Sequence, residues 1–100
     1  MRKYANEIQK AISLAVSEGI PCKYRNGIIV LENSGNEINL CIEHRKDYKF
    51  VRWFWLDEWE NEIDIATAFV QSPFYADYPD ISTAVYETAI FAIRKINTTF

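Results

Sequence analysis

The chain has 100 residues, of which 49% are hydrophobic and 25% charged, and its formal net charge at pH 7 is −3. This composition excludes a disordered chain, and no apolar run reaches the roughly eighteen residues of a membrane span. The length suits a single domain, 1–100, that buries a core without disulfides. Cys22 and Cys41 show no CxxC spacing and no neighbouring histidine, so we expect reduced thiols in a cytoplasmic protein.

The charges are unevenly distributed along the chain. The range 53–93 contains eight carboxylates and no Lys, Arg or His, whereas residues 1–52 carry nine Lys and Arg against six acids. Such a division favours a basic partner, or association between opposite ends of two copies. Because the domain is net acidic, direct binding to nucleic acid is not expected.

The first expected element is a helix over residues 3–18. Apolar side chains recur there at intervals of three and four residues, from Tyr4 to Val16, and form one stripe. Gly19 supplies a left-handed stop, and Pro21 prevents continuation of the helix.

A run of short strands follows. Asn26-Gly27 is typical of a two-residue hairpin turn, because both residues tolerate a positive φ. Alternating patterns and further turn residues extend this hairpin into an antiparallel meander of three or four strands. The expected strands are 22–25, 28–32, 38–43 and 48–56, with turns at 33–36 and 45–47.

The strand 48–56 is apolar on both sides. One side carries Phe50, Phe54 and Leu56 with Arg52 among them, and the other carries Val51, Trp53 and Trp55. A strand of this kind needs cover on both faces, so either the helices divide between the faces or another molecule closes one of them. Arg52 would be costly if buried alone, and we expect a carboxylate partner such as Glu32 or Glu43.

The segment 57–80 is ambiguous. Ile63, Ile65, Thr67 and Phe69 alternate as in a strand, whereas the spacing of Ile63, Ala66, Phe69 and Val70 fits a short helix. We favour a helix over 63–71, ended by Ser72-Pro73 and followed by a loop over 74–79.

The last element is a long helix from Ile81 to about Asn97, with Asp80 as its N-cap. Its apolar surface is wide, which indicates either deep packing or a dimer contact. The expected fold is therefore α+β: an N-terminal helix, an antiparallel meander of three or four strands, and a long C-terminal helix packed on the sheet.

Residues with catalytic potential are few. His44 is the one histidine, and its place in a charged run is typical of a solvated turn rather than of a general base. The sequence contains no GxSxG, Walker-type or GxGxxG motif. We therefore expect no enzymatic activity, no cofactor and no metal.

The candidate site is an acidic segment with one tryptophan, consisting of Asp57, Glu58, Trp59, Glu60, Glu62 and Asp64. One interpretation is a solvated turn followed by a helix start, where acids favour the helix dipole. A second is a surface that binds a basic partner, with Trp59 as an exposed anchor. A third is a metal or catalytic cluster, although the spacing of an EF-hand loop is absent.

Two resemblances are present. The tail Asp77-Tyr78-Pro79-Asp80, followed by an Ala-rich helix through Ala92, resembles the closing helix of small phage proteins called ABA sandwiches; it covers about twenty residues. The order of elements over about 55 residues, a helix, Gly19 and a meander, resembles the opening of type III secretion chaperones, which are small, acidic, dimeric binders of effector segments. Neither resemblance transfers a functional residue.

These observations lead to one functional hypothesis and one alternative. The first is a non-enzymatic interaction protein, such as a phage or prophage accessory factor, that binds a basic protein partner through the acidic segment. The alternative is a chaperone-like homodimer that binds an extended polypeptide. Its dimer contact would be the apolar face of Ile81–Ile96 or the face that carries Trp53 and Trp55.

Overall fold

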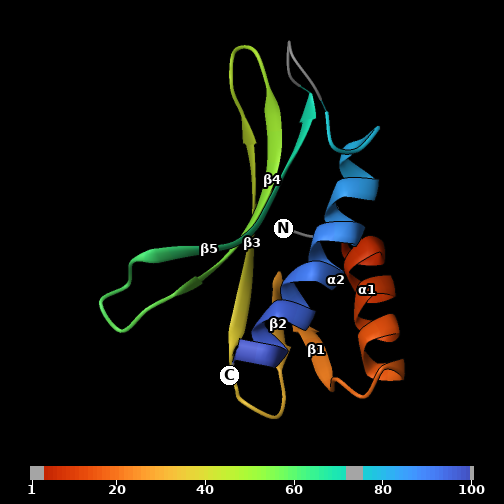
Figure 1. Cartoon of the computed structure of the whole chain (residues 1–100), viewed down its shortest axis with the longest axis vertical. Coiled ribbons are helices and arrows are strands. Elements are labelled where there is room, and N and C mark those ends of the chain that lie inside the picture. Colours follow the sequence, from red (N-terminus) through yellow and green to blue (C-terminus); the bar gives the residue numbers. More distant parts are fainter. Residues whose placement is uncertain (1–3, 72–75, 100) are drawn as a thin grey trace.

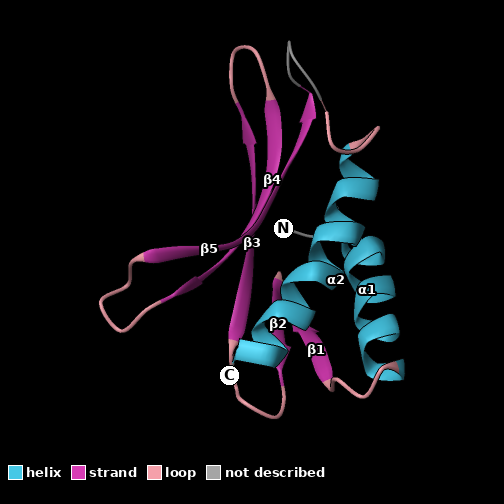
Figure 2. Ribbon diagram, in the orientation of Figure 1, coloured by secondary structure: helices cyan, strands magenta, loops and turns pink. Residues whose placement is uncertain are grey.

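The computed structural model describes residues 4–71 and 76–99 and shows two layers. The elements in chain order are α1 (Ala5–Ser17), β1 (Cys22–Arg25), β2 (Ile28–Leu31), β3 (Glu37–His44), β4 (Lys49–Leu56), β5 (Glu62–Gln71) and α2 (Ile81–Thr99). The five strands form one antiparallel sheet in chain order, and both helices lie on the same side of it (Figure 1, Figure 2). The expected α+β class is confirmed, with five strands in place of three or four.

The helix α1 forms as expected within the described residues. Its stripe of Ile8, Ala11, Ile12 and Ala15 is buried. Gly19 takes a φ of 86°, and the amide of Ile20 donates to the carbonyl of Ala15 at 2.9 Å, which closes the C-terminus. The expected first residue of this helix, Lys3, lies outside the described residues.

The hairpin of β1 and β2 is also confirmed. Asn26 and Gly27 have φ values of 51° and 82°, as a two-residue turn with two left-handed positions requires. The next strand pair is short, because β2 aligns only with Glu37–Asn39 of β3. The strand β3 continues to His44, which pairs with Lys49, the first residue of β4.

The helix predicted for 63–71 is wrong, because these residues belong to β5. This strand pairs with β4 from Leu56↔Glu62 to Lys49↔Gln71. Register shifts between Trp53 and Phe54 and between Lys49 and Phe50 leave one extra residue of β5, Ile65 and then Val70, at each bulge. A helix here would have left the second edge of β4 without hydrogen-bond partners. The Ser72-Pro73 stop proposed for that helix and the start of the loop 74–79 lie outside the described residues.

The core lies between the helices and one face of the sheet. Val51 and Trp53 of β4 are fully buried on this face, and Trp55 is half-buried there. The two helices therefore do not divide between the faces: across the described residues, no helix covers the opposite face with Phe50 and Phe54 (Figure 1).

The apolar face of α2 is internal as well. Its main stripe is fully buried and comprises Ala84, Val85, Ala89, Ala92 and Ile93. The main stripe of α2 and the face of Trp53 therefore pack against each other within the chain.

The N-terminus of α2 is capped as expected. The amide of Thr83 donates to Oδ1 of Asp80 at 2.7 Å, and this bond lowers the pKa of the Asp80 carboxyl. The helix continues to Thr99, two residues beyond the expected end. In the part of the chain that the structure describes, no helix is both long and apolar enough to cross a membrane.

Candidate protein-binding arm

The end of the β4–β5 hairpin projects away from the helix layer (Figure 1). We call residues 54–64 the β4–β5 arm. It contains all six residues of the predicted acidic site, so the structure brings these residues together on one hairpin. Their individual roles differ, because some of the carboxylates hold the arm together and others face solvent.

Asp57 organises the turn of the arm. Its Oδ1 atom accepts hydrogen bonds from the amides of Trp59, at 2.9 Å, and Asn61, at 2.8 Å. The backbone of Asp57 also donates to the carbonyl of Asn61 at 3.0 Å. The hydrogen bonds that the carboxylate accepts, that from the Asn61 amide above all, lower the pKa of the Asp57 carboxyl. Asp57 is therefore a structural residue of the turn rather than a free charge.

The large apolar side chains of the arm are unusually exposed. Trp59 at the turn is 74% exposed, Leu56 is 48% exposed and Ile63 is 39% exposed. The exposure of Trp59 expected from its two acidic neighbours is confirmed. Large apolar side chains that are exposed on a projecting element, Trp above all, are typical of protein–protein contacts.

Two of the predicted site residues form ion pairs with Arg52 of β4. Its guanidinium contacts Glu62 at 2.6 Å and Asp64 at 2.8 Å, and lies 4.7 Å from the centre of the Phe54 ring. These two hydrogen-bonded carboxylates, Glu62 first, raise the pKa of Arg52. A carboxylate partner was expected, but Glu43 lies at the limit of contact, 4.0 Å, and Glu32 forms no described contact with Arg52. Sequence reasoning missed the main partners, because Glu62 and Asp64 come beside Arg52 only through the pairing of β5 with β4.

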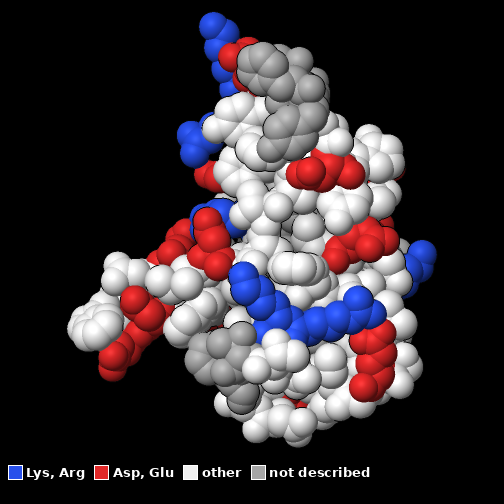
Figure 3. All heavy atoms as spheres, viewed as in Figure 1, with Lys and Arg blue, Asp and Glu red and all other residues white. Residues whose placement is uncertain are grey.

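Glu58 and Glu60 remain as the free charges of the arm. Both are exposed, and neither forms an ion pair with any residue that the structure describes. Basic side chains gather instead around the β3–β4 turn, at the opposite end of β4, where Arg45, Lys46 and Lys49 lie. Figure 3 shows this separation, with acidic atoms along the arm and basic atoms at the far end.

The residues weighed for catalysis are not assembled into a site. His44 is exposed at the last position of β3, and the neighbouring Glu43 carboxylate contacts Arg45 at 3.0 Å. Burial and, to a smaller extent, the charge of Glu32 raise the pKa of the Cys22 thiol to about 11, which disfavours the reactive thiolate. Across residues 4–71 and 76–99, no cluster of three His, Cys, Asp or Glu side chains could hold a metal ion.

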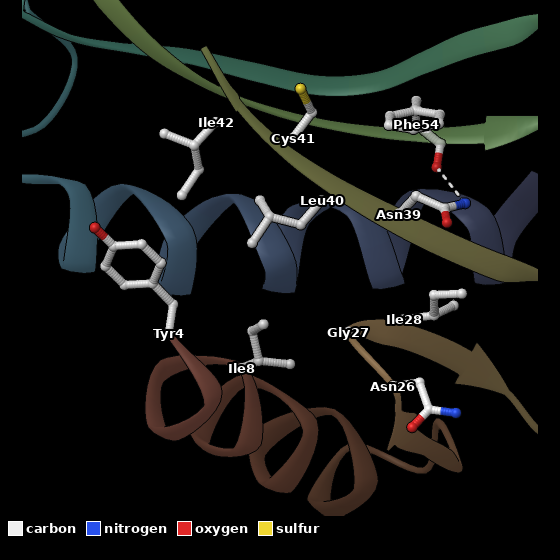
Figure 4. Close-up of a pocket in the computed structure, with 10 residues that line it drawn as sticks. All are labelled: Tyr4, Ile8, Asn26, Gly27, Ile28, Asn39, Leu40, Cys41, Ile42 and Phe54. Carbon is white, nitrogen blue, oxygen red and sulfur yellow. Dashed lines mark hydrogen bonds between the residues drawn. The ribbon is translucent and has the colours of Figure 1, made fainter. Parts of the chain in front are cut away.

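A second surface was missed by sequence reasoning. A cavity of about 510 Å³ opens along β3, between the N-terminal part of α1 and the β1–β2 turn (Figure 4). Its walls include Tyr4 and Ile8 of α1 and Leu40 and Ile42 of β3. The signal that could have revealed it is the difference in strand length, because β2 has four residues and β3 has eight.

No family model, curated protein sequence or solved structure matches this chain.

Proposed function

We propose that this chain is a non-enzymatic interaction protein that binds a basic surface of a partner protein through the β4–β5 arm. The observation that carries the proposal is Trp59, which is 74% exposed at the end of a projecting hairpin, between Glu58 and Glu60. A role as a phage or prophage accessory factor belongs to the same proposal and rests on the resemblance of the tail, residues 77–92.

The chemistry of the arm supports a contact of mixed character. An indole ring that becomes buried at a contact contributes a large apolar area, and tryptophan is enriched among the residues that dominate binding energy. The free carboxylates of Glu58 and Glu60 complement Lys and Arg side chains around that anchor and speed the encounter of the two proteins.

The rigidity of the turn also favours binding. The hydrogen bonds that Asp57 accepts from Trp59 and Asn61 fix the backbone that carries the anchor. The Arg52 pairs hold the base of the arm in the same way. A preorganised loop loses less conformational entropy on binding than a flexible one.

Charge reversal on the arm tests this function. Immobilised protein, wild type or carrying Glu58→Lys and Glu60→Lys, would be used to capture partners from cells that express the chain, with quantification of each captured protein. We expect at least one basic protein whose recovery falls at least about tenfold with the double variant. Its recovery should also fall when NaCl is raised, since salt screens exposed charges.

The matched control reverses two carboxylates elsewhere, Glu32→Lys with Glu87→Lys, and changes the net charge by the same amount. Both residues are exposed and lie outside the arm. Partner recovery should stay within about twofold of wild type with this control. Equal recovery by the arm variant and the wild type would refute the proposed function.

A further inference from the structure

The C-terminal part of β3, residues 40–44, has an unpaired edge. On one side, Asn39–His44 pairs with β4 along its whole length. On the other side, β2 pairs with β3 only as far as Asn39, because the chain turns away at Asn26 and Gly27. Within the described residues, no strand lies against the second side of residues 40–44. We call this stretch the β3 edge.

Residues 40–42 of the β3 edge form one wall of the 510 Å³ cavity. Figure 4 shows Leu40 and Ile42 pointing from β3 towards the α1 side of the cavity, where Tyr4 and Ile8 lie. Cys41 points to the other side of the strand, as does Phe54 from β4. The volume lies in the range of ligand clefts, and the lining on the α1 side is apolar.

The opposite edge of the sheet is protected in a way that the β3 edge is not. On β5, the ammonium group of Lys95 donates to the carbonyl of Ile65 at 3.2 Å. Further along, Asp77 bonds both backbone groups of Phe69, accepting from its amide and donating to its carbonyl, each at 2.8 Å. Charged groups that cover an edge prevent strand addition. No described side chain caps residues 40–42 in this manner.

We propose that the β3 edge binds an extended segment of a partner polypeptide, which adds to the sheet as a strand along residues 40–44. Unpaired backbone amides and carbonyls in a row are complementary to another strand, which fixes the chemistry of the occupant. Side chains at alternate positions of the segment would enter the cavity, so these positions are apolar, opposite Tyr4, Ile8, Leu40 and Ile42.

The same geometry favours a single extended peptide segment over a second copy of the chain as the occupant of the edge. The edge is flanked by α1 on one side and by the turn at Asn26 and Gly27 on the other. A second copy that paired through its own β3 edge would bring its own helix and turn towards these walls, whereas a single extended segment carries neither. This surface is separate from the β4–β5 arm and does not depend on the proposed role of the arm.

A peptide selection followed by backbone methylation tests the proposal. A library of linear nonapeptides would be selected against the full chain, and the strongest binder synthesised as a series with one N-methylated amide at each position. We expect affinity to fall at least about fivefold at alternate amides, those that face β3, and less than about twofold at the amides between them. Methylation removes a donor without altering the protein, so folding of the protein is not at issue.

Hydrogen exchange of the full chain locates the bound peptide. Amide exchange within residues 40–44 should slow at least about tenfold on binding. The variant with Glu58→Lys and Glu60→Lys should bind the same peptide with unchanged affinity, which separates this site from the arm.

Four results would overturn the proposal. They are the recovery of no peptide that binds below about 1 mM, binding that leaves exchange at 40–44 unchanged, affinity insensitive to methylation at every position, and a dimer of the free protein in which 40–44 is already protected.

Discussion

At the scale of single residues, the tertiary contact that joins α2 to the sheet depends on Thr88. This residue is buried, and its hydroxyl accepts a hydrogen bond from the indole nitrogen of Trp53 at 2.8 Å while it donates to the carbonyl of Ala84. Because Trp53 is fully buried, its N–H group has no access to water as an alternative partner. The hydroxyl of Thr88 therefore allows a tryptophan to occupy the centre of the core.

Replacing Thr88 by Val tests this interpretation, because the change keeps the shape of the side chain and removes the acceptor. We expect the free energy of unfolding to fall by about 1–3 kcal/mol, the typical cost of an unsatisfied buried donor. Urea denaturation followed by circular dichroism would measure it. Thr98→Val, at an exposed site of the same helix, should change the value by less than about 0.5 kcal/mol. Equal stabilities of Thr88→Val and wild type would contradict the role of this bond.

Side-chain environments were predictable where local sequence decides them. The exposure of Trp59 follows from Glu58 and Glu60 on either side, and the cap at Asp80 follows from the proline before it and the helical pattern after it. The partners of Arg52 were not predictable in this way, because they depend on the register of β5 against β4. A contact between side chains of two strands can be predicted only after both strands have been assigned correctly.

At the scale of elements, β5 shows why a short apolar run can be misread. Each bulge inserts one residue, so the spacing of buried positions departs from strict alternation and includes neighbours such as Ile65 and Ala66. Within a window of nine residues, such a pattern also fits a helix. The pairing requirement of β4 decides between the two, and this requirement is visible only once the whole sheet is assembled.

The N-cap of α2 leads to a prediction about pH. The pKa of Asp80 is lower in the folded chain than in the unfolded chain, because the carboxylate accepts a bond from the Thr83 amide. A group of this kind contributes its full stabilisation above its unfolded pKa, about 3.9, and loses it as the pH falls through the folded value. Asp80→Ala should therefore unfold at a lower urea concentration than wild type at pH 7, and the difference should shrink below about pH 4.

Asp80→Asn is the matched control for this prediction. An asparagine side chain still accepts the bond from the Thr83 amide but does not titrate, so its stabilisation should not depend on pH. Urea midpoints measured for all three proteins between pH 7 and pH 3 would give the comparison. A difference between Asp80→Ala and wild type that is the same at both ends of this range would show that the carboxylate charge has no part in the cap.

At the scale of the whole molecule, the uneven distribution of charge along the sequence becomes an uneven distribution of charge over the surface, and β4 connects the two regions. Its first residue follows the basic β3–β4 turn, and its last residue leads into the acidic arm, so the two kinds of charge lie at opposite ends of one long strand (Figure 3). The division of charge was readable from the sequence. The pairing of Glu62 and Asp64 with Arg52 could not be read from the sequence, and it leaves Glu58 and Glu60 as the carboxylates of the arm without an ion pair or hydrogen bond among the described residues.

Both helices cover the same face of the sheet. The arm projects away from the two helices (Figure 1). Trp59 at its end is the most exposed of the large hydrophobic residues that the structure describes. We propose that this residue is the contact point with a basic partner.

Site-specific crosslinking tests that claim most directly. A photoreactive benzoylphenylalanine would be placed at Trp59 or, as a control, at Phe91, an aromatic residue of α2 that is 57% exposed. After irradiation in cells that express the chain, we expect position 59 to yield a crosslink to a basic protein at least about tenfold more strongly than position 91. Crosslinking at position 59 no stronger than at position 91, or an absence of crosslinks from position 59, would contradict the account.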